Sequence, residues 1–418
     1  MIRRLWPFIM GSVALGLDAY VIAGLLPAIS TSLASREATV GLGVAAFTGA
    51  YALVGPVLAG SAGRHPSRSL AIALTIFTVA NIATALSPTV WVFLVARVVA
   101  GAAAGVYSPL SSAVAAALVG AEQRGRALSL VLAGLAGGTV FGVPVGLMLS
   151  ERWGWRSAIA LIVITGALAM VGIVCRNRNL PEVPASSLRQ RLRAITRTDN
   201  LVTVTVTLLT GVASLGLYTY LALVLGQSSL SSHQTLAIWV WGIGGAIGAL
   251  GIGRVVDRGH PLRLSLILLV GLACALAGMT ASEMPAVLLV SLLIWGVCGW
   301  ASLTPQQHIL IASNPEDGAT AVAANASANY LGSALGAVCG SVLVRQDWSA
   351  GALCLAAAAV AAGAVLLQLA RTRMDHRHPN AALTPRHRLI VAHLVVEDGC
   401  PVSKVATRFQ VSWPMVKR

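Results

Sequence analysis

Long apolar segments dominate this chain, and they limit it to folds that cross a lipid bilayer. The first of them, residues 5–29, is long enough to span the membrane as a helix, and its only charged side chain is Asp18. A carboxylate at membrane depth costs a few kcal/mol or more, so it persists where it has a polar partner, a water-filled cavity or a proton to carry. Asp18 is therefore the first candidate for a functional residue.

The composition agrees with a membrane protein. Hydrophobic residues make up 56% of the chain and charged residues 10%, against about 25% charged in a soluble protein. We expect an all-α membrane protein in which twelve transmembrane helices form two six-helix halves, 1–175 and 201–371, joined by a basic linker at 176–200. The spans are predicted at 5–29, 39–61, 69–88, 90–118, 126–150, 156–175, 201–225, 235–256, 262–281, 285–312, 318–344 and 349–370.

The distribution of arginine predicts the orientation. With the N-terminus inside, the cytoplasmic loops carry fifteen arginines and the outer loops carry four. Because positive charge is enriched in cytoplasmic loops, both termini are expected on the cytoplasmic side of a bacterial inner membrane. The linker 176–200 is interpreted as a cytoplasmic tether, with contact to anionic lipid headgroups as the alternative. The first span is too long for a cleavable signal, so we expect it to remain as a permanent helix.

The two halves share a loop pattern. The segment GSAGRHPSR (60–68) follows the second span and GRVVDRGHPLR (253–263) follows the eighth, and both place arginines around a His-Pro pair. Six-helix halves with matching loops are typical of transporters built from internal repeats.

On these motifs the region 1–372 resembles the major facilitator superfamily, in particular its twelve-helix drug:proton antiporters. The resemblance extends to chloramphenicol-resistance exporters and arabinose-efflux-like permeases through LDAYVIAGLLPAIS (17–30), GRALSLVLAGLAGGTVFGVPVG (125–146) and NASANYLGSALGA (325–337). It implies the major facilitator fold and a cytoplasmic gating role for Arg64, Asp257 and Arg258. The acid that the family places before Arg64 is replaced by Gly63, which puts the first-half gate in doubt.

The fourth span holds a second charge, Arg97, in LVARVVAGAAAG (94–105), which resembles the family's fourth-helix signature. Counted along their helices, Asp18 and Arg97 both lie roughly 10–20 Å from the outer surface, so they could pair directly or through water. A neighbouring cation favours the ionised acid and burial favours the neutral acid, so Asp18 could exchange a proton while Arg97 tunes it. The alternatives are a structural hydrogen bond for Asp18 and an inert packing charge for Arg97.

The fifth span is rich in glycine and resembles the antiporter signature of the family, with one extra residue before its proline. Small residues allow close helix contact, and a proline frees a backbone acceptor. The resemblance implies that this seam seals the resting cavity against leak, and packing alone is the alternative. The residues concerned are Gly134, Gly138, Gly142, Pro144 and Gly146.

Other polar residues in the spans are weaker candidates for lining a substrate cavity: Tyr20, Gln306, Gln307, Asn325 and Asn329. Asn325 and Asn329 are four residues apart and share a helix face. Hydrogen bonding between helices is the simpler interpretation of the amides. The six cysteines lack the spacing of metal or redox motifs, and the few acids lie mostly in loops, so no metal, cofactor or enzymatic activity is expected.

Residues 372–418 differ in character and contain both lysines of the chain, Lys404 and Lys417. A helix is predicted to start at Thr384-Pro385 and to end at Gly399, with a second short helix at 402–409. NAALTPRHRL, VVEDG, PVSKVATRF and VSWPMVKR resemble the N-terminal helix-turn-helix of insertion-sequence transposases. We interpret this tail as a fusion, with a cytoplasmic regulatory tail as the alternative. Because base readout needs a complete recognition helix, no specific nucleic-acid partner is expected.

Together these features predict a monomeric, proton-coupled exporter of small amphipathic compounds such as the antibiotic chloramphenicol. It would expose a midplane cavity alternately to each side of the membrane. Its partners would be a small-molecule substrate, protons and the lipid bilayer. The alternatives are efflux of a sugar or metabolite, and a membrane-tethered DNA-binding regulator that the tail alone favours.

Overall fold

In a computed structural model, the described part of the chain consists of helices joined by turns; it comprises residues 2–120, 123–176, 180–183, 198–258, 260–313, 318–376 and 390–409. The chain divides into two compact units, Met1–Gln368 and Leu369–Arg418. The described residues contain twelve helical segments that are long and apolar enough to cross a membrane. This confirms the predicted all-α fold with twelve transmembrane helices.

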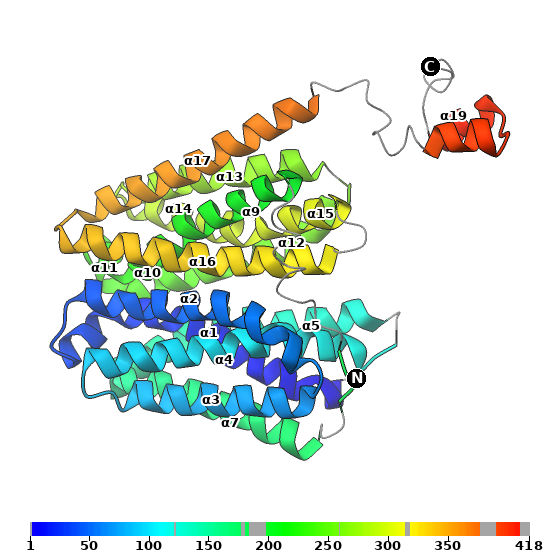
Figure 1. The fold of residues 1–418 in the computed structure, drawn as a ribbon. Helices are drawn as coiled ribbons and strands as arrows, with labels where there is room; N and C mark the ends of the chain where they lie inside the picture. Colours follow the sequence, from blue (N-terminus) through cyan, green and yellow to red (C-terminus); the bar gives the residue numbers. More distant parts are fainter. Residues whose placement is uncertain are drawn as a thin grey trace. The chain divides into compact units, whose positions relative to one another are not determined.

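The first six spans pack together (Figure 1). Five are single helices: α1 (Ile2–Ser32), α2 (Glu37–Ala62), α3 (Pro66–Ala85), α4 (Val90–Ala117) and α7 (Trp155–Arg176). The fifth span consists of α5 (Arg124–Gly137), the π-helical turn η2 (Gly138–Gly142) and α6 (Val143–Trp153). The π turn ends two residues before Pro144, whose ring removes an N–H donor and crowds the preceding turn of a regular helix.

The second six spans are less regular. The seventh consists of α9 (Thr198–Thr210), the π turn η3 (Gly211–Leu215) and α10 (Gly216–Thr219); the backbone turns at Tyr220 and resumes as α11 (Leu221–Gly226). The tenth is interrupted at Ser302, three residues before Pro305, because proline cannot continue the helical hydrogen bonds. The remaining helices are η4 (Ser231–His233), α12 (Gln234–Arg258), α13 (Pro261–Gly278), α14 (Pro285–Ala301), α15 (Leu303–Ser313), α16 (Gly318–Arg345) and α17 (Ala350–His376).

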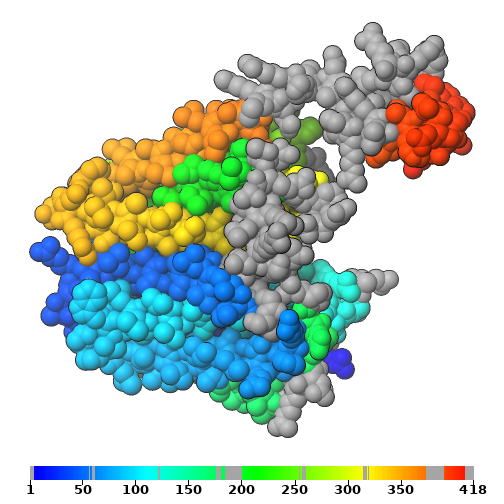
Figure 2. Space-filling view, in the orientation of Figure 1, coloured from blue at the N-terminus to red at the C-terminus, as the bar shows by residue number. Residues whose placement is uncertain are grey.

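The two halves meet mainly where α2 packs on α16, and also where α12 contacts η2 and α6. On the face in Figure 2, the blue surface of the first half adjoins the yellow surface of the second. Ser341 Oγ on α16 donates a hydrogen bond to the backbone carbonyl of Ala38 on α2 at 2.8 Å. Further along the same helices, the rings of Tyr51 and Tyr330 stack with their centroids 3.8 Å apart. The contact between the halves therefore combines small and aromatic residues.

The second unit contains η5 (His393–Glu397) and α19 (Val402–Arg408) in its described part. Val391 and Val405 are buried in a small apolar cluster of this unit. Gly399 has a φ of +61°, a left-handed conformation that glycine adopts without strain and that ends a helix, as predicted there. Thr384-Pro385 and residues 410–418 lie outside the described residues, so the partial helix-turn-helix stays a prediction.

Candidate functional site: a buried ion pair and an aromatic bridge

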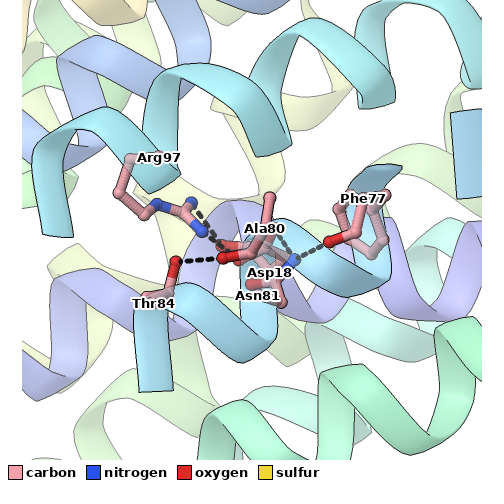
Figure 3. A network of polar contacts seen from close by, with 6 residues as sticks. All are labelled: Asp18, Phe77, Ala80, Asn81, Thr84 and Arg97. Carbon is pink, nitrogen blue, oxygen red and sulfur yellow. Dashed lines mark hydrogen bonds and ion pairs between the residues drawn. The ribbon is translucent and has the colours of Figure 1, made fainter. Parts of the chain in front are cut away.

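Asp18 lies in the middle of α1 with none of its side chain exposed to solvent. Its Oδ1 is 2.5 Å from Nη1 of Arg97 on α4, and its Oδ2 accepts a hydrogen bond of 3.2 Å from Asn81 Nδ2 on α3. Figure 3 shows the three side chains converging from three different helices. The structure thus pairs directly the two charges whose depths the sequence predicted to overlap.

Arg97 is held by more than its ion pair. Its Nη2 lies 3.4 Å from the backbone carbonyl of Asp18, and its guanidinium carbon is 4.4 Å from the ring centroid of Phe47 on α2. Its side chain is 1% exposed, and its Nε is buried without a hydrogen-bond partner. A fixed, dehydrated guanidinium of this kind stabilises the charged carboxylate more strongly than a solvated one would.

Asn81 is a member of the site that the sequence analysis did not identify. Its amide donates both to Asp18 and to the backbone carbonyl of Phe77 at 3.1 Å, while its Oδ1 has no partner. The available signal was a polar amide inside the apolar span 69–88. With this residue, every polar neighbour that the structure shows around the Asp18 carboxylate comes from the first half of the protein.

The glycines of the fifth span pack against α1, within the same half. A methyl group added at Gly134 would lie 2.6 Å from the backbone oxygen of Ile9, and one at Gly138 would overlap the backbone of Val13 and Leu17. At Gly142 and Gly146 the nearest atoms are side-chain carbons of Leu17 and Val21, at 3.3 and 3.0 Å; Pro144 is buried beside them. Since Leu17 precedes Asp18, this seam fixes the part of α1 that carries the carboxylate.

A second set of residues lies between the halves. Tyr20 on α1 contacts Tyr218 on α10, Trp241 on α12 and Trp300 on α14, with ring centroids 5.4, 5.7 and 5.8 Å away. We call these four residues the aromatic bridge. Tyr20 follows Asp18 by two positions, so one helix presents the carboxylate to its own half and an aromatic ring to the other half. Of this set, the sequence analysis named only Tyr20 as a candidate.

The predicted amides fall elsewhere. Gln306 on α15 is buried and donates to Ser265 Oγ at 2.6 Å, which is a hydrogen bond between helices of the second half. Asn325 on α16 is fully buried, and neither atom of its amide has a partner. The backbone oxygen of Asn329 lies against Gly211 of η3, and Gln307 is half-buried on α15. The structure thus places Gln306 in a hydrogen bond between helices, and a role in lining a substrate cavity stays a prediction for these residues.

The cytoplasmic loop residues are also separate from the ion pair. Arg64 is exposed in the turn between α2 and α3. The carbonyl of Gly63 accepts a hydrogen bond of 3.1 Å from the backbone N–H of Val183, so part of the linker lies on this turn. Asp257 and Arg258 belong to the last turn of α12, and their side chains lie outside what the structure describes.

A membrane protein built from two six-helix halves, with the contact between them lined by small and aromatic residues, has the architecture of a secondary transporter. The sequence profile of the Major Facilitator Superfamily matches residues 8–337. The chain therefore belongs to this superfamily.

Individual relatives agree with this assignment. The inner membrane transport protein YdhP of Escherichia coli K12 is 26% identical over 366 residues, which cover 86% of this chain and 93% of that protein. A chloramphenicol resistance protein of Streptomyces lividans is 29% identical over 299 residues, covering 69% of this chain and 75% of that protein. The xylose transporter XylE from E. coli, in a partially occluded inward open conformation, matches with a TM-score of 0.70 at 18% identity, covering 88% of this chain and 98% of XylE. This last likeness shows the fold alone.

Proposed function

We propose that this transporter exports small amphipathic compounds in exchange for protons, and that Asp18 carries the proton. The observation that supports this most directly is the fully buried Asp18–Arg97 pair. Away from the ends of the twelve predicted spans, these two residues are the only Asp, Glu, Lys or Arg. Ionisable residues at membrane depth are costly to keep, and they commonly serve ion or proton pathways.

The geometry offers a way to link the proton to the conformation. Protonation of Asp18 removes its attraction to Arg97, and α1 is then held less firmly against α4. Because α1 also carries Tyr20 into the aromatic bridge, a shift of this helix changes the contact between the halves. In an exporter, Asp18 would take up a proton when the protein faces outward and release it when the protein faces inward, while the substrate moves the other way.

The close contact between α1 and the fifth span would prevent leakage during this motion. Gly134, Gly138, Gly142 and Gly146 let the two helices approach closely, which leaves no room for a leak of protons or water along α1. In the same proposal, Arg64, Asp257 and Arg258 act at the cytoplasmic side. The export direction rests on the resemblance of the fifth span to antiporters and on the relative from Streptomyces lividans, which is named for chloramphenicol resistance.

We test the proton role by transport into inverted membrane vesicles with an imposed pH gradient, using chloramphenicol within a broad ligand panel. Asp18→Asn should abolish gradient-driven uptake at normal membrane abundance, and Asp18→Glu should retain part of it because the charge survives. Asp347→Asn is the matched control, since Asp347 is an exposed acid outside the spans. Full gradient-driven transport by Asp18→Asn would refute the assignment.

We further propose that the protein is a monomer in a bacterial inner membrane with both termini in the cytoplasm. The excess of arginine in the loops assigned to the cytoplasm supports this orientation. Fusions of a reporter that is active only in the cytoplasm, placed after residue 376 and within the loop at 346–349, should be active at the first site and inactive at the second. The opposite pattern would reverse the topology.

A further inference from the structure

Two indole N–H groups of the aromatic bridge have no hydrogen-bond acceptor. The Nε1 atoms of Trp241 and Trp300 are both buried and both unpartnered. Their neighbour Trp295, which packs against Trp241 with ring centroids 6.1 Å apart, donates its own N–H to Ser214 Oγ at 2.7 Å. Buried donors in folded proteins are nearly always paired, so the two free donors require an explanation.

The bridge also lacks formal charge. The two residues with a permanent or acidic charge in the interior of the spans, Asp18 and Arg97, neutralise each other within the first half. The remaining Asp, Glu, Lys and Arg residues lie in loops, at span ends or in the tail. A charged ligand at the bridge would therefore find no unpaired countercharge at its own depth, and a dehydrated charge without a partner is strongly disfavoured.

The rings themselves form a surface for flat apolar groups. The ring centroids of Tyr218 and Trp241 are 4.2 Å apart, and the two ring planes are inclined by 34°. The ring of Tyr20 meets that of Tyr218 edge-on, with an angle of 78° between their planes. Such arrangements present both ring faces and ring edges, which suits an added aromatic ring. Gly245 makes space for Trp300, because a methyl group there would lie 3.0 Å from its Cδ1 and Nε1 atoms. The donors and the ring surfaces thus belong to one place between the halves.

We propose that the aromatic bridge is the substrate site, and that it selects uncharged aromatic compounds carrying acceptor oxygens such as nitro or carbonyl groups. Trp241 and Trp300 donate their N–H groups to those oxygens, and Tyr20 and Tyr218 pack on the aromatic ring. This inference rests on the proposed export function and specifies its substrate class. A quaternary organic cation such as tetraphenylphosphonium, which aromatic rings also attract, carries no acceptor oxygen and leaves both indole donors unpaired.

The test is calorimetric binding to the purified full-length protein in detergent, without a pH gradient. The probes are chloramphenicol as the uncharged nitroaryl compound, tetraphenylphosphonium as the aromatic cation and benzoate as the aromatic anion. Chloramphenicol should bind, and neither ion should bind or compete. Trp241→Phe and Trp300→Phe keep an aromatic ring but remove the donor, so each should weaken chloramphenicol binding about three- to tenfold. Trp295→Phe is the matched control and should stay within about twofold, because its N–H already has an acceptor.

Absence of chloramphenicol binding, competition by tetraphenylphosphonium at equal concentration, or wild-type affinity in both Trp241→Phe and Trp300→Phe would each overturn the proposal. Thermal unfolding of every variant shows whether it is folded, and the two donor variants are independent of each other. The result is distinguishable from the export test. Normal binding without gradient-driven transport refutes proton-coupled export alone, and gradient-driven transport with unchanged binding in both variants refutes the site alone.

Discussion

The carboxylate of Asp18 has the cation Arg97 and the amide of Asn81 beside it and no exposed surface. Counting residues from the span ends predicted that these two charges share a depth, because helix rise is constant. The same reasoning could not find Asn81, since an uncharged amide in a span does not show which neighbour it faces. Nor could it find the unpaired N–H donors of Trp241 and Trp300, because the sequence does not show whether a tryptophan in an apolar span has a hydrogen-bond acceptor.

At the same scale, either charge of the ion pair should destabilise the folded protein when its partner is removed. Arg97→Met leaves a buried carboxylate without its cation, which should lower the free energy of unfolding by about 3–5 kcal/mol. Adding Asp18→Asn removes that charge and should restore at least half of the loss. Chemical denaturation in detergent measures both, with Arg152→Met as a control at an exposed arginine. A double variant less stable than Arg97→Met would show that the pair does not determine the loss.

At the scale of helices, the crossing of α1 with the fifth span positions the carboxylate. The glycine spacing predicted a close contact but not its partner, because small residues mark proximity without identifying the neighbour. The π turn at Gly138–Gly142 was also beyond the sequence, since one shifted turn leaves hydropathy unchanged. The break at Ser302 was missed for the same reason, although Pro305 marks its position. Thr139 adds a polar contact to the crossing, with its Oγ1 3.3 Å from the carbonyl of Gly16.

Two adjacent glycines allow a sharp test of this crossing. A methyl group at Gly138 overlaps the backbone of Val13, whereas at Gly137 nothing lies within 4 Å. Gly138→Ala should therefore cost about 1–3 kcal/mol through overpacking and reduce gradient-driven transport severalfold. Gly137→Ala should leave both unchanged or slightly improve stability. Equal transport by the two variants would mean that α1 and the fifth span do not need this close approach.

At the scale of the whole molecule, hydropathy and loop charge predicted the number of spans and their division into halves. They could not show which helix faces meet, because apolar surfaces toward lipid and toward protein have the same composition. The pairing of α2 with α16 and the aromatic bridge became visible only in three dimensions. The tail has a different composition and lies in a separate compact unit.

Removal of residues 376–418 should leave gradient-driven transport within about twofold of the full chain, because all twelve candidate spans end before this segment. The isolated tail should bind DNA without sequence preference and only weakly in physiological salt, since its net charge is basic and attraction to phosphates carries no sequence information. Transport in vesicles and a DNA-binding titration measure the two effects. Lost transport at normal membrane abundance, or sequence-specific binding, would instead support a regulatory tail.

Alternating access requires the halves to separate where they now touch. The hydrogen bond from Ser341 Oγ to the Ala38 carbonyl joins the last turns of α16 to the first turn of α2, at the end assigned to the outer side. In a Cys339→Ser background, Ala38→Cys with Ser341→Cys, joined by a short bifunctional thiol reagent, should therefore stop export, and a reductant that releases the reagent should restore it.

The matched control cross-links two positions inside the first half. Arg156 Nη1 donates to Ser32 Oγ at 3.1 Å, so Ser32→Cys with Arg156→Cys joins positions that move together as one half. That cross-link should leave transport close to its uncross-linked level. Export that continues when positions 38 and 341 are joined would mean that the outer ends of α2 and α16 stay together throughout the cycle, and the opening would then have to occur along α12, η2 and α6 instead.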